Sequence, residues 1–225
     1  MVPIETIVFD SEFDFIHEIC GFISKVAKES IQNSGVFRFV LTGGNTIKKI
    51  YESLVLEDID WNDCEFFLGD ERYVDKASEE LNYNLAYHSF FSKISYDPKK
   101  VFKCNTDLDL ENSALDYEKQ ISKTPIFDLV LLGLGDDGHI ASLFPGRQFD
   151  MEMIGNSVAI VKNAPKKPSN RITLTLNRLN DTKHQLIFTH LNGKEQIVNS
   201  IIEETVGYPI ADLNPKESLR LLYLK

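Results

Sequence analysis

The sequence lacks several features that would mark particular classes of protein. Only three cysteines occur in 225 residues, widely spaced and without a C-x-x-C pair, so neither a disulfide framework nor a zinc site is indicated. We expect Cys20, Cys64 and Cys104 to be reduced, mostly buried thiols. No apolar run approaches the roughly 20 residues that cross a bilayer, and the N-terminal segment carries Glu5 but no Lys or Arg before its apolar run. We therefore expect a cytoplasmic protein that is not bound to a membrane.

Positive charge is also scarce. The 24 Lys and Arg residues against 34 Asp and Glu give a net charge of −10, which disfavours non-specific attraction to nucleic acid or to an anionic membrane surface. A site for an anionic ligand would then need a local cluster of basic residues. No internal repeat, low-complexity tract or linker-like segment interrupts the chain, so we expect residues 1–225 to form a single domain.

Segments typical of strands and helices alternate along the chain. Strands are expected over 4–9, 36–41, 64–71, 127–135 and 184–190. Helices are expected from Ser11 to a stop at 33–35, from Asn45 or Thr46, around 80–92 and 111–122, and from about Gly193. Strands that are apolar on both faces predict an α/β fold, a doubly wound and mostly parallel sheet with helices on both faces. In such folds ligands bind beyond the carboxyl ends of the strands, here the loops after residues 41, 69, 133 and 190. The strand order, and whether the C-terminal ESLRLLYLK adds an edge strand, stay open.

The first of these loops places two glycines before a helix. In LTGGNTIKKIY (41–51), Gly43 and Gly44 leave a strand, and Asn45 or Thr46 opens a helix. Backbone N–H groups of such a loop can converge on an anion, and the helix N-terminus adds a favourable dipole. A plain strand-to-helix turn explains the pattern equally well. The loop lacks the G-K-[S/T] ending of a Walker motif, which disfavours a nucleoside triphosphate.

The second loop places three charges directly after a strand. In FFLGDERYV (66–74), Asp70, Glu71 and Arg72 are either a solvated loop or part of a ligand site, since Arg72 offers a planar fork suited to phosphate or carboxylate. Arg171, which begins the strand-like RITLTLNRLN (171–180), and Lys194, at the start of a helix, are the other candidates for the basic cluster. Together these residues would allow an acidic protein to hold an anionic substrate.

The third loop, GLGDDGHIASLFPG (133–146), is the most informative segment. Its GLGDDG matches G-x-G-x-x-G only superficially, because no early βαβ unit surrounds it and Pro145 and Gly146 interrupt the helix that should follow. What remains is His139 in a glycine-rich loop, with Asp137 two residues earlier. An imidazole there suits general-base catalysis, and a nearby carboxylate could fix its tautomer and stabilise its charged form.

Other polar residues near these loops receive structural interpretations. Asn82 and Asn84, at the start of a helix, are interpreted as helix caps. Ser142 has no G-x-S-x-G elbow around it, so capping or backbone bonding is favoured over a nucleophilic role. His184 and His190 are too far apart and unsupported for a metal site, and no H-E-x-x-H motif occurs, so no metal is expected.

Together, the loop motifs resemble those of a known family. TGGNT, GDERYV, LNYNLA, DLVLLGLGDDGHIASLFPG and RITLTLNRLN, in this order, cover nearly the whole chain and are similar to 6-phosphogluconolactonases, in the superfamily of glucosamine/galactosamine-6-phosphate isomerases. The most specific motif is GDDGHIASLFPG. The related glucosamine-6-phosphate deaminases share its D-G-H core but continue into an Asn-Glu-Pro segment that supplies a carboxylate, whereas here the continuation starts at Ser142 and contains none.

The resemblance implies hydrolysis of 6-phospho-D-glucono-1,5-lactone to 6-phosphogluconate in the oxidative pentose phosphate pathway, without a metal or organic cofactor. Matched position by position, His139 would be the base that activates water, and Asp137 would orient it. Arg72, Arg171 and Lys194 would hold the phosphate or polarise the lactone, and which cation stabilises the oxyanion stays open. The implied substrate-binding residues are Gly43, Gly44, Asn45, Asp70, Arg72, Arg171 and Lys194.

The sequence departs from the family pattern in its first loop. The family commonly has S-G-G-S-T-P, whereas Thr42, Asn45 and Ile47 replace the two serines and the proline here. A proline in the first helical turn is helpful but dispensable, and Asn45 can still donate to an anion. The departure therefore concerns the rigidity of the loop more than activity.

Two alternative functions stay open. A glucosamine-6-phosphate deaminase is disfavoured by the missing carboxylate, and would be indicated by release of ammonia. A non-catalytic sugar-phosphate sensor is disfavoured because no basic helix-turn-helix region appears. The only partner expected is the small sugar-phosphate lactone, with the chain as a monomer or small homo-oligomer.

Overall fold

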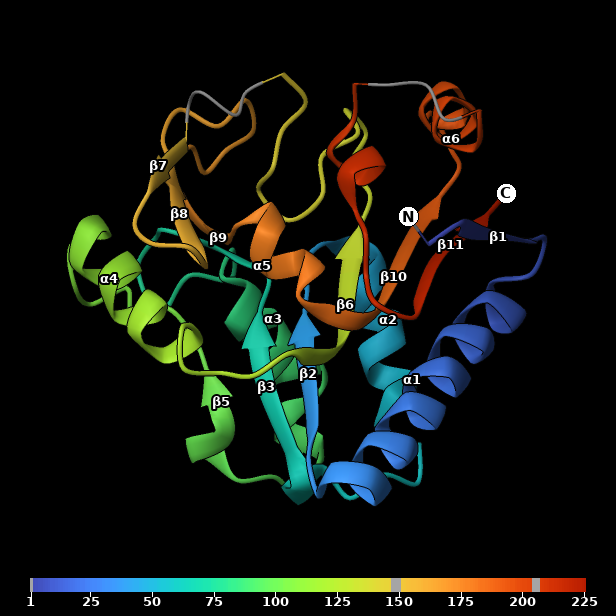
Figure 1. Cartoon of the computed structure of the whole chain (residues 1–225), viewed down its shortest axis with the longest axis horizontal. Coiled ribbons are helices and arrows are strands. Elements are labelled where there is room, and N and C mark those ends of the chain that lie inside the picture. Colours follow the sequence, from blue (N-terminus) through green and yellow to red (C-terminus); the bar gives the residue numbers. More distant parts are fainter. Residues whose placement is uncertain (1, 147–150, 204–206) are drawn as a thin grey trace.

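The computed structural model describes residues 2–146, 151–203 and 207–225, and within them the predicted parallel sheet is present with seven strands (Figure 1). All neighbouring strands of this sheet run parallel, in the order β1-β11-β10-β6-β2-β3-β5. The strands are β1 (Ile4–Phe9), β2 (Phe37–Leu41), β3 (Cys64–Leu68), β5 (Val101–Phe102), β6 (Phe127–Gly133), β10 (Thr182–His190) and β11 (Ser218–Leu224). The C-terminal segment is therefore inserted between β1 and β10, and β1 forms the edge.

Helices cover both faces of this sheet, as the apolar pattern predicts. The helices are α1 (Glu12–Ser34), α2 (Asn45–Leu54), α3 (Asn82–Ser89), α4 (Leu110–Ile121), α5 (Leu176–Asn180) and α6 (Glu195–Ile202). Neighbouring strand residues alternate between two buried cores: Phe39 and Leu41 pack with α1, α2 and α3, whereas Val40 packs with α4 and α6. The doubly wound architecture thus follows from strands that are apolar on both sides.

The predicted start and stop of the first helix are confirmed. The hydroxyl of Ser11 accepts a hydrogen bond from the backbone N–H of Asp14, which satisfies one free donor of the first turn. Gly35 ends the helix in the left-handed conformation, with φ of 73°.

A second, antiparallel sheet was not predicted. It contains β4 (Asp70–Arg72), β9 (Arg171–Leu174), β8 (Val158–Val161) and β7 (Met151–Met153), in the order β4-β9-β8-β7. The expected single strand 64–71 is therefore wrong, because the chain changes sheets at Gly69. The N–H of Gly69 still bonds to Leu41 in the parallel sheet, while its carbonyl accepts from Leu174 in the second sheet.

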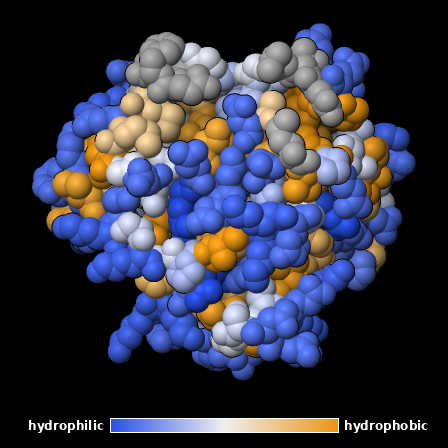
Figure 2. Space-filling view, viewed as in Figure 1, coloured by the Kyte–Doolittle hydropathy of each residue, from blue (hydrophilic) through white to orange (hydrophobic). Residues whose placement is uncertain are grey.

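The surface and the cysteines agree with the composition. The face in Figure 2 is mostly hydrophilic, with apolar side chains in separate groups. Cys20, Cys64 and Cys104 are buried, as expected. Among the described residues, no helix is both long and apolar enough to cross a membrane.

Candidate active site

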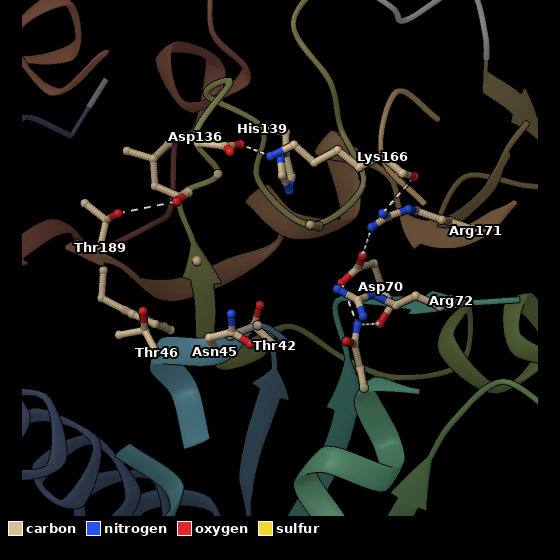
Figure 3. Close-up of a pocket in the computed structure, with 18 of the residues that line it drawn as sticks. Thr42, Asn45, Thr46, Asp70, Arg72, Asp136, His139, Lys166, Arg171 and Thr189 are labelled. Atoms are coloured by element: carbon tan, nitrogen blue, oxygen red, sulfur yellow. Dashed lines mark hydrogen bonds and ion pairs between the residues drawn. The ribbon is translucent and has the colours of Figure 1, made fainter. Parts of the chain in front are cut away.

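A cavity of about 390 Å³ lies beyond the carboxyl ends of β2, β6 and β10, where the two sheets meet. All four predicted loops contribute to it (Figure 3). It brings together eight of the nine predicted site residues, and the ninth, Asp137, contacts one of them. The eight are Gly43, Gly44, Asn45, Asp70, Arg72, His139, Arg171 and Lys194.

His139 is held by its own loop. Its Nδ1 contacts the carboxylate of Asp137, and its backbone N–H lies 3.3 Å from the same oxygen. With Nδ1 engaged, Nε2 is left for a ligand, and His139 lines the cavity. The loop needs glycine at position 135, because a Cβ there would lie 2.1 Å from the imidazole Nδ1 of His139. The imidazole also packs on Phe144, with 4.8 Å between ring centroids.

The charge of Asp137 suits this contact. Burial alone would raise the pKa of its carboxyl, but the hydrogen bond and the charge of His139 outweigh burial and lower that pKa. Asp137 is thus ionised whenever the imidazole is poised to accept a proton. A fixed negative charge at Nδ1 favours the tautomer whose Nε2 is a free base.

Two arginines face each other across the antiparallel ladder. Arg72 in β4 pairs directly with Arg171 in β9, and like charges at such positions are destabilising unless something compensates. Arg171 is only 3% exposed and donates to the carbonyl oxygens of Lys166, Lys167 and Pro168. Its Nη1 lies 3.9 Å from a carboxylate oxygen of Asp70. Both guanidinium groups line the cavity, so an anionic ligand there would relieve their repulsion.

The glycine loop and Lys194 form another basic wall. Helix α2 begins at Asn45, and its N-cap residue is Gly44, with φ of 105° and no capping side chain. The first-turn N–H groups of α2 therefore lack a side-chain cap at the cavity. Lys194 lines the same cavity, and its ammonium donates to the carbonyl of Leu134 and the hydroxyl of Thr189. Burial lowers the pKa of Lys194, with a further contribution from the charge of Lys166.

Asp70 lines the cavity and is held by hydrogen bonds from two neighbouring side chains. Its side chain accepts hydrogen bonds from Ser142 Oγ at 2.6 Å and from Asn82 Nδ2 at 3.1 Å, and Asp70 is 5% exposed. Ser142 therefore bonds to a side chain instead of capping or bonding to the backbone as expected. Its hydroxyl is already committed to Asp70, which leaves a nucleophilic role without support.

The interpretation of Asn82 and Asn84 as helix caps is wrong. The N-cap of α3 is Leu81, and the first N–H groups of the helix are accepted by the Glu71 carboxylate. Asn82 instead points its amide at Asp70 and lines the cavity. Asn84 donates to the carbonyls of Lys76 and Ser78. The contacts between β4 and α3 decide these roles, and no local sequence pattern predicts those contacts.

Sequence reasoning missed two lysines. Lys166 and Lys167 line the cavity from the loop before β9, and the Lys166 ammonium contacts the carboxylate of Asp136. In Figure 3 the Lys166 side chain reaches past His139 towards Asp136. The only signal was a pair of basic residues in a proline-containing loop, which is ordinary for a solvated surface.

The chemistry available is that of an anion-binding site with one base. Five cationic side chains line it, on Arg72, Lys166, Lys167, Arg171 and Lys194. In the described part of the chain, no three His, Cys, Asp or Glu side chains are grouped to hold a metal ion. A histidine base beside preorganised cations suits addition of water to a carbonyl group of an anionic substrate.

Comparison with known proteins gives a consistent result. Residues 10–222 match the family model described as glucosamine-6-phosphate isomerases/6-phosphogluconolactonase. The chain is 35% identical over 221 residues to 6-phosphogluconolactonase 3, chloroplastic, of Arabidopsis thaliana, covering 91% of this chain and 68% of the relative. It is 36% identical over 201 residues to a probable 6-phosphogluconolactonase of Schizosaccharomyces pombe, covering 82% and 78%.

Solved structures of similar proteins have the same fold. The structure of 6-phosphogluconolactonase from Thermotoga maritima matches with a TM-score of 0.88 at 28% identity, over 98% of this chain and 100% of that one. The 6-phosphogluconolactonase from Trypanosoma cruzi matches with a TM-score of 0.86 at 28% identity, over 100% and 95%. The chain therefore has a fold that these 6-phosphogluconolactonases share.

Proposed function

We propose, from the premise that the chain belongs to the glucosamine-6-phosphate isomerase/6-phosphogluconolactonase family, that it hydrolyses 6-phospho-D-glucono-1,5-lactone to 6-phospho-D-gluconate. This is the second step of the oxidative pentose phosphate pathway. The observation that carries the proposal is His139, bound through Nδ1 to Asp137 and lining a cavity with five cationic side chains. The substrate is a phosphate ester with a reactive carbonyl, so it requires both features.

In the proposed mechanism, His139 takes a proton from water while that water attacks the lactone carbonyl. Asp137 holds the tautomer and stabilises the imidazolium that forms. The tetrahedral oxyanion then collapses, the ring C–O bond breaks, and His139 returns the proton to the leaving ring oxygen. The base is thus regenerated within one cycle, and no cofactor is assigned to the reaction.

The arrangement of the cations suggests how the substrate lies. We assign the phosphate to the wall formed by the α2 N-terminus and Lys194, because uncapped N–H groups and a helix dipole suit a dianion. Arg171 and His139 both contact the ring of Phe144, so Arg171 is the cation placed to stabilise the oxyanion near the base. In Figure 3 the arginines and Thr46 lie on opposite sides of the cavity.

The deaminase alternative has less support. In this chain the position after the D-G-H core leads to Ser142, whose hydroxyl is bonded to Asp70. No carboxylate from that segment is available to act on an amino sugar. A non-catalytic sensor would bind the sugar phosphate without requiring a histidine base held by Asp137.

The test is the rate at which purified protein consumes the lactone, generated in situ from glucose 6-phosphate, relative to spontaneous hydrolysis. A rate far above background supports the proposal. A rate equal to background refutes it, and ammonia release from glucosamine 6-phosphate in a parallel assay would then identify a deaminase.

We further propose that residues 1–225 act as one hydrolase domain, as a monomer or small homo-oligomer in the cytoplasm. Three buried cysteine thiols fit a reducing compartment.

A further inference from the structure

The Glu71 carboxylate connects β4 to α3 at the back of the site. We propose that Glu71 is a positioning residue for the hydrolysis, which sets the places of Arg72 and Asn82 by accepting backbone hydrogen bonds from both. The inference rests on the proposed lactonase function, and it assigns a role to a buried acid that the mechanism does not use. Glu71 is not one of the described residues that line the candidate active-site cavity.

Three N–H groups converge on this carboxylate. Oε1 accepts from the N–H of Arg72 at 2.8 Å and from that of Asn82 at 2.7 Å, and Oε2 accepts from the N–H of Tyr83 at 2.9 Å. Glu71 therefore caps α3 from a neighbouring strand, in place of the missing side-chain cap at Leu81. Its charge also complements the positive end of the α3 dipole.

The residues held in this way extend into the active site. Asn82 uses its amide to fix Asp70, and Arg72 donates from Nη1 to the carbonyl of Glu80 at 2.9 Å. The Arg72 Nε is buried and has no partner among the residues described, so the bond from Nη1 to Glu80 and the backbone position fixed by Glu71 set the direction of that guanidinium. A shift of β4 relative to α3 would move both Arg72 and Asn82, and small misplacements of binding groups reduce rates strongly.

A simple structural cap would not need a buried carboxylate. Glu71 is 2% exposed, and a serine at position 81 would cap α3 without burying a charge. Capping by Glu71 also links the strand that carries Arg72 to the helix that carries Asn82. That link is the feature the proposal explains.

The surroundings of Glu71 make this link sensitive to pH. Burial raises the pKa of its carboxyl to about 7. The three N–H bonds oppose this increase, and the charge of Asp70 adds to it. On its other side Glu71 lines a second cavity of about 500 Å³. The titratable and charged groups that line this cavity with Glu71 or interact with its charge are Asp70, Lys76, Tyr83, Lys103, Cys104, Asp107, Asp116 and Tyr117.

Protonation would weaken the link. A neutral carboxyl turns one oxygen into a donor, so it accepts fewer of the three N–H groups than the carboxylate does. As the pH falls through 7, Arg72 and Asn82 should be held less firmly, and substrate binding should weaken.

Kinetics of Glu71→Gln test the role, with Glu79→Gln as the matched control. Glu79 is exposed, lies in the segment between β4 and α3, and loses the same negative charge on substitution. We expect Glu71→Gln to raise KM about tenfold, as for loss of one hydrogen bond to a charged group, with a smaller change in kcat. The wild-type KM should rise as the pH falls below 7, and Glu71→Gln should lack this rise while Glu79→Gln keeps it. An identical KM profile in wild type and Glu71→Gln would overturn the proposal.

A measurement on the wild-type protein covers the case in which Glu71→Gln does not fold. The carboxyl ¹³C resonance of Glu71 and the amide protons of Arg72, Asn82 and Tyr83 should titrate with one shared midpoint near pH 7. Amide protons that do not follow the Glu71 carboxyl would refute the link. This readout is independent of activity. A chain with the shared titration but no lactonase activity would refute the proposed function, whereas an active chain without it would refute only the role of Glu71.

Discussion

The hydroxyl of Ser142 donates to the carboxylate of Asp70 at 2.6 Å, across 72 residues of sequence. The bond joins the loop that carries His139 to the strand that carries Arg72, and both partners are buried. The base and the arginine pair are thus on segments that this bond joins. The segment that follows His139 therefore supports the site without taking part in the chemistry.

Ser142→Ala should lower stability more than it changes the reaction. Removing a hydrogen bond to a buried carboxylate costs about 1.5–3 kcal/mol of unfolding free energy, measurable by urea unfolding. Ser113→Ala is the matched control, since its hydroxyl is buried with no partner among the described residues, and it should be neutral or stabilising. Complete loss of activity in folded Ser142→Ala would contradict this account by indicating a nucleophile.

Gly43→Ala should impair the site through Asn82. A Cβ at position 43 would lie 1.8 Å from Asn82 Oδ1, so the amide must leave Asp70. We expect kcat/KM to fall by roughly tenfold or more, as for a misplaced binding group. In an Asn82→Ala background the same glycine change should have little further effect. Gly21→Ala, in an exposed helical position with no atom within 4 Å, should instead raise stability by about 1 kcal/mol.

Much of the fold could be predicted because local patterns determine it. The alternating segments gave the parallel sheet, and Ser11 and Gly35 bound the first helix as predicted. The antiparallel sheet could not be predicted, because three-residue and four-residue strands such as β4 and β9 are shorter than any periodic pattern. Their pairing depends on contacts between segments about 100 residues apart.

The candidate site, like the fold, could be predicted only in part. His139, Asp137 and the glycine loop could be found because glycines and charges gathered at strand ends are typical of ligand sites in α/β folds. Lys166 and the role of Asn82 could not, since both depend on which strand or loop lies opposite. The pairing of Arg72 with Arg171 is visible only in the ladder, although each residue was a candidate by itself.

Lys194→Met should separate phosphate binding from chemistry. If Lys194 holds the phosphate, KM for the phosphorylated lactone should rise roughly 10- to 100-fold, as for loss of a hydrogen bond to a charged group. Hydrolysis of unphosphorylated glucono-1,5-lactone should change little. Lys48→Met, an exposed charge change on α2, should leave both substrates unaffected. Equal losses with the two lactones would place Lys194 at the carbonyl instead.

Asp137→Asn should lower kcat while leaving KM nearly unchanged. The amide keeps the shape but loses the charge that fixes the tautomer of His139, and we expect a loss of roughly 10- to 100-fold, part of the 10²–10⁴ that general-base catalysis supplies. Because the pKa of Asp137 is lowered by His139, its carboxylate should stay ionised as the pH falls through the range in which an imidazole titrates. The acid limb of wild-type kcat should therefore follow a single protonation, and a limb with two protonations would contradict this assignment.

The central claim is that His139 is the base, and comparing folded His139→Ala with the wild type tests it most directly. The measurement is the rate of lactone hydrolysis above the spontaneous rate at saturating substrate, with circular dichroism to verify folding. The account predicts that kcat falls by about 10²- to 10⁴-fold while binding of the product 6-phosphogluconate persists. A folded His139→Ala protein that retains wild-type turnover would contradict it.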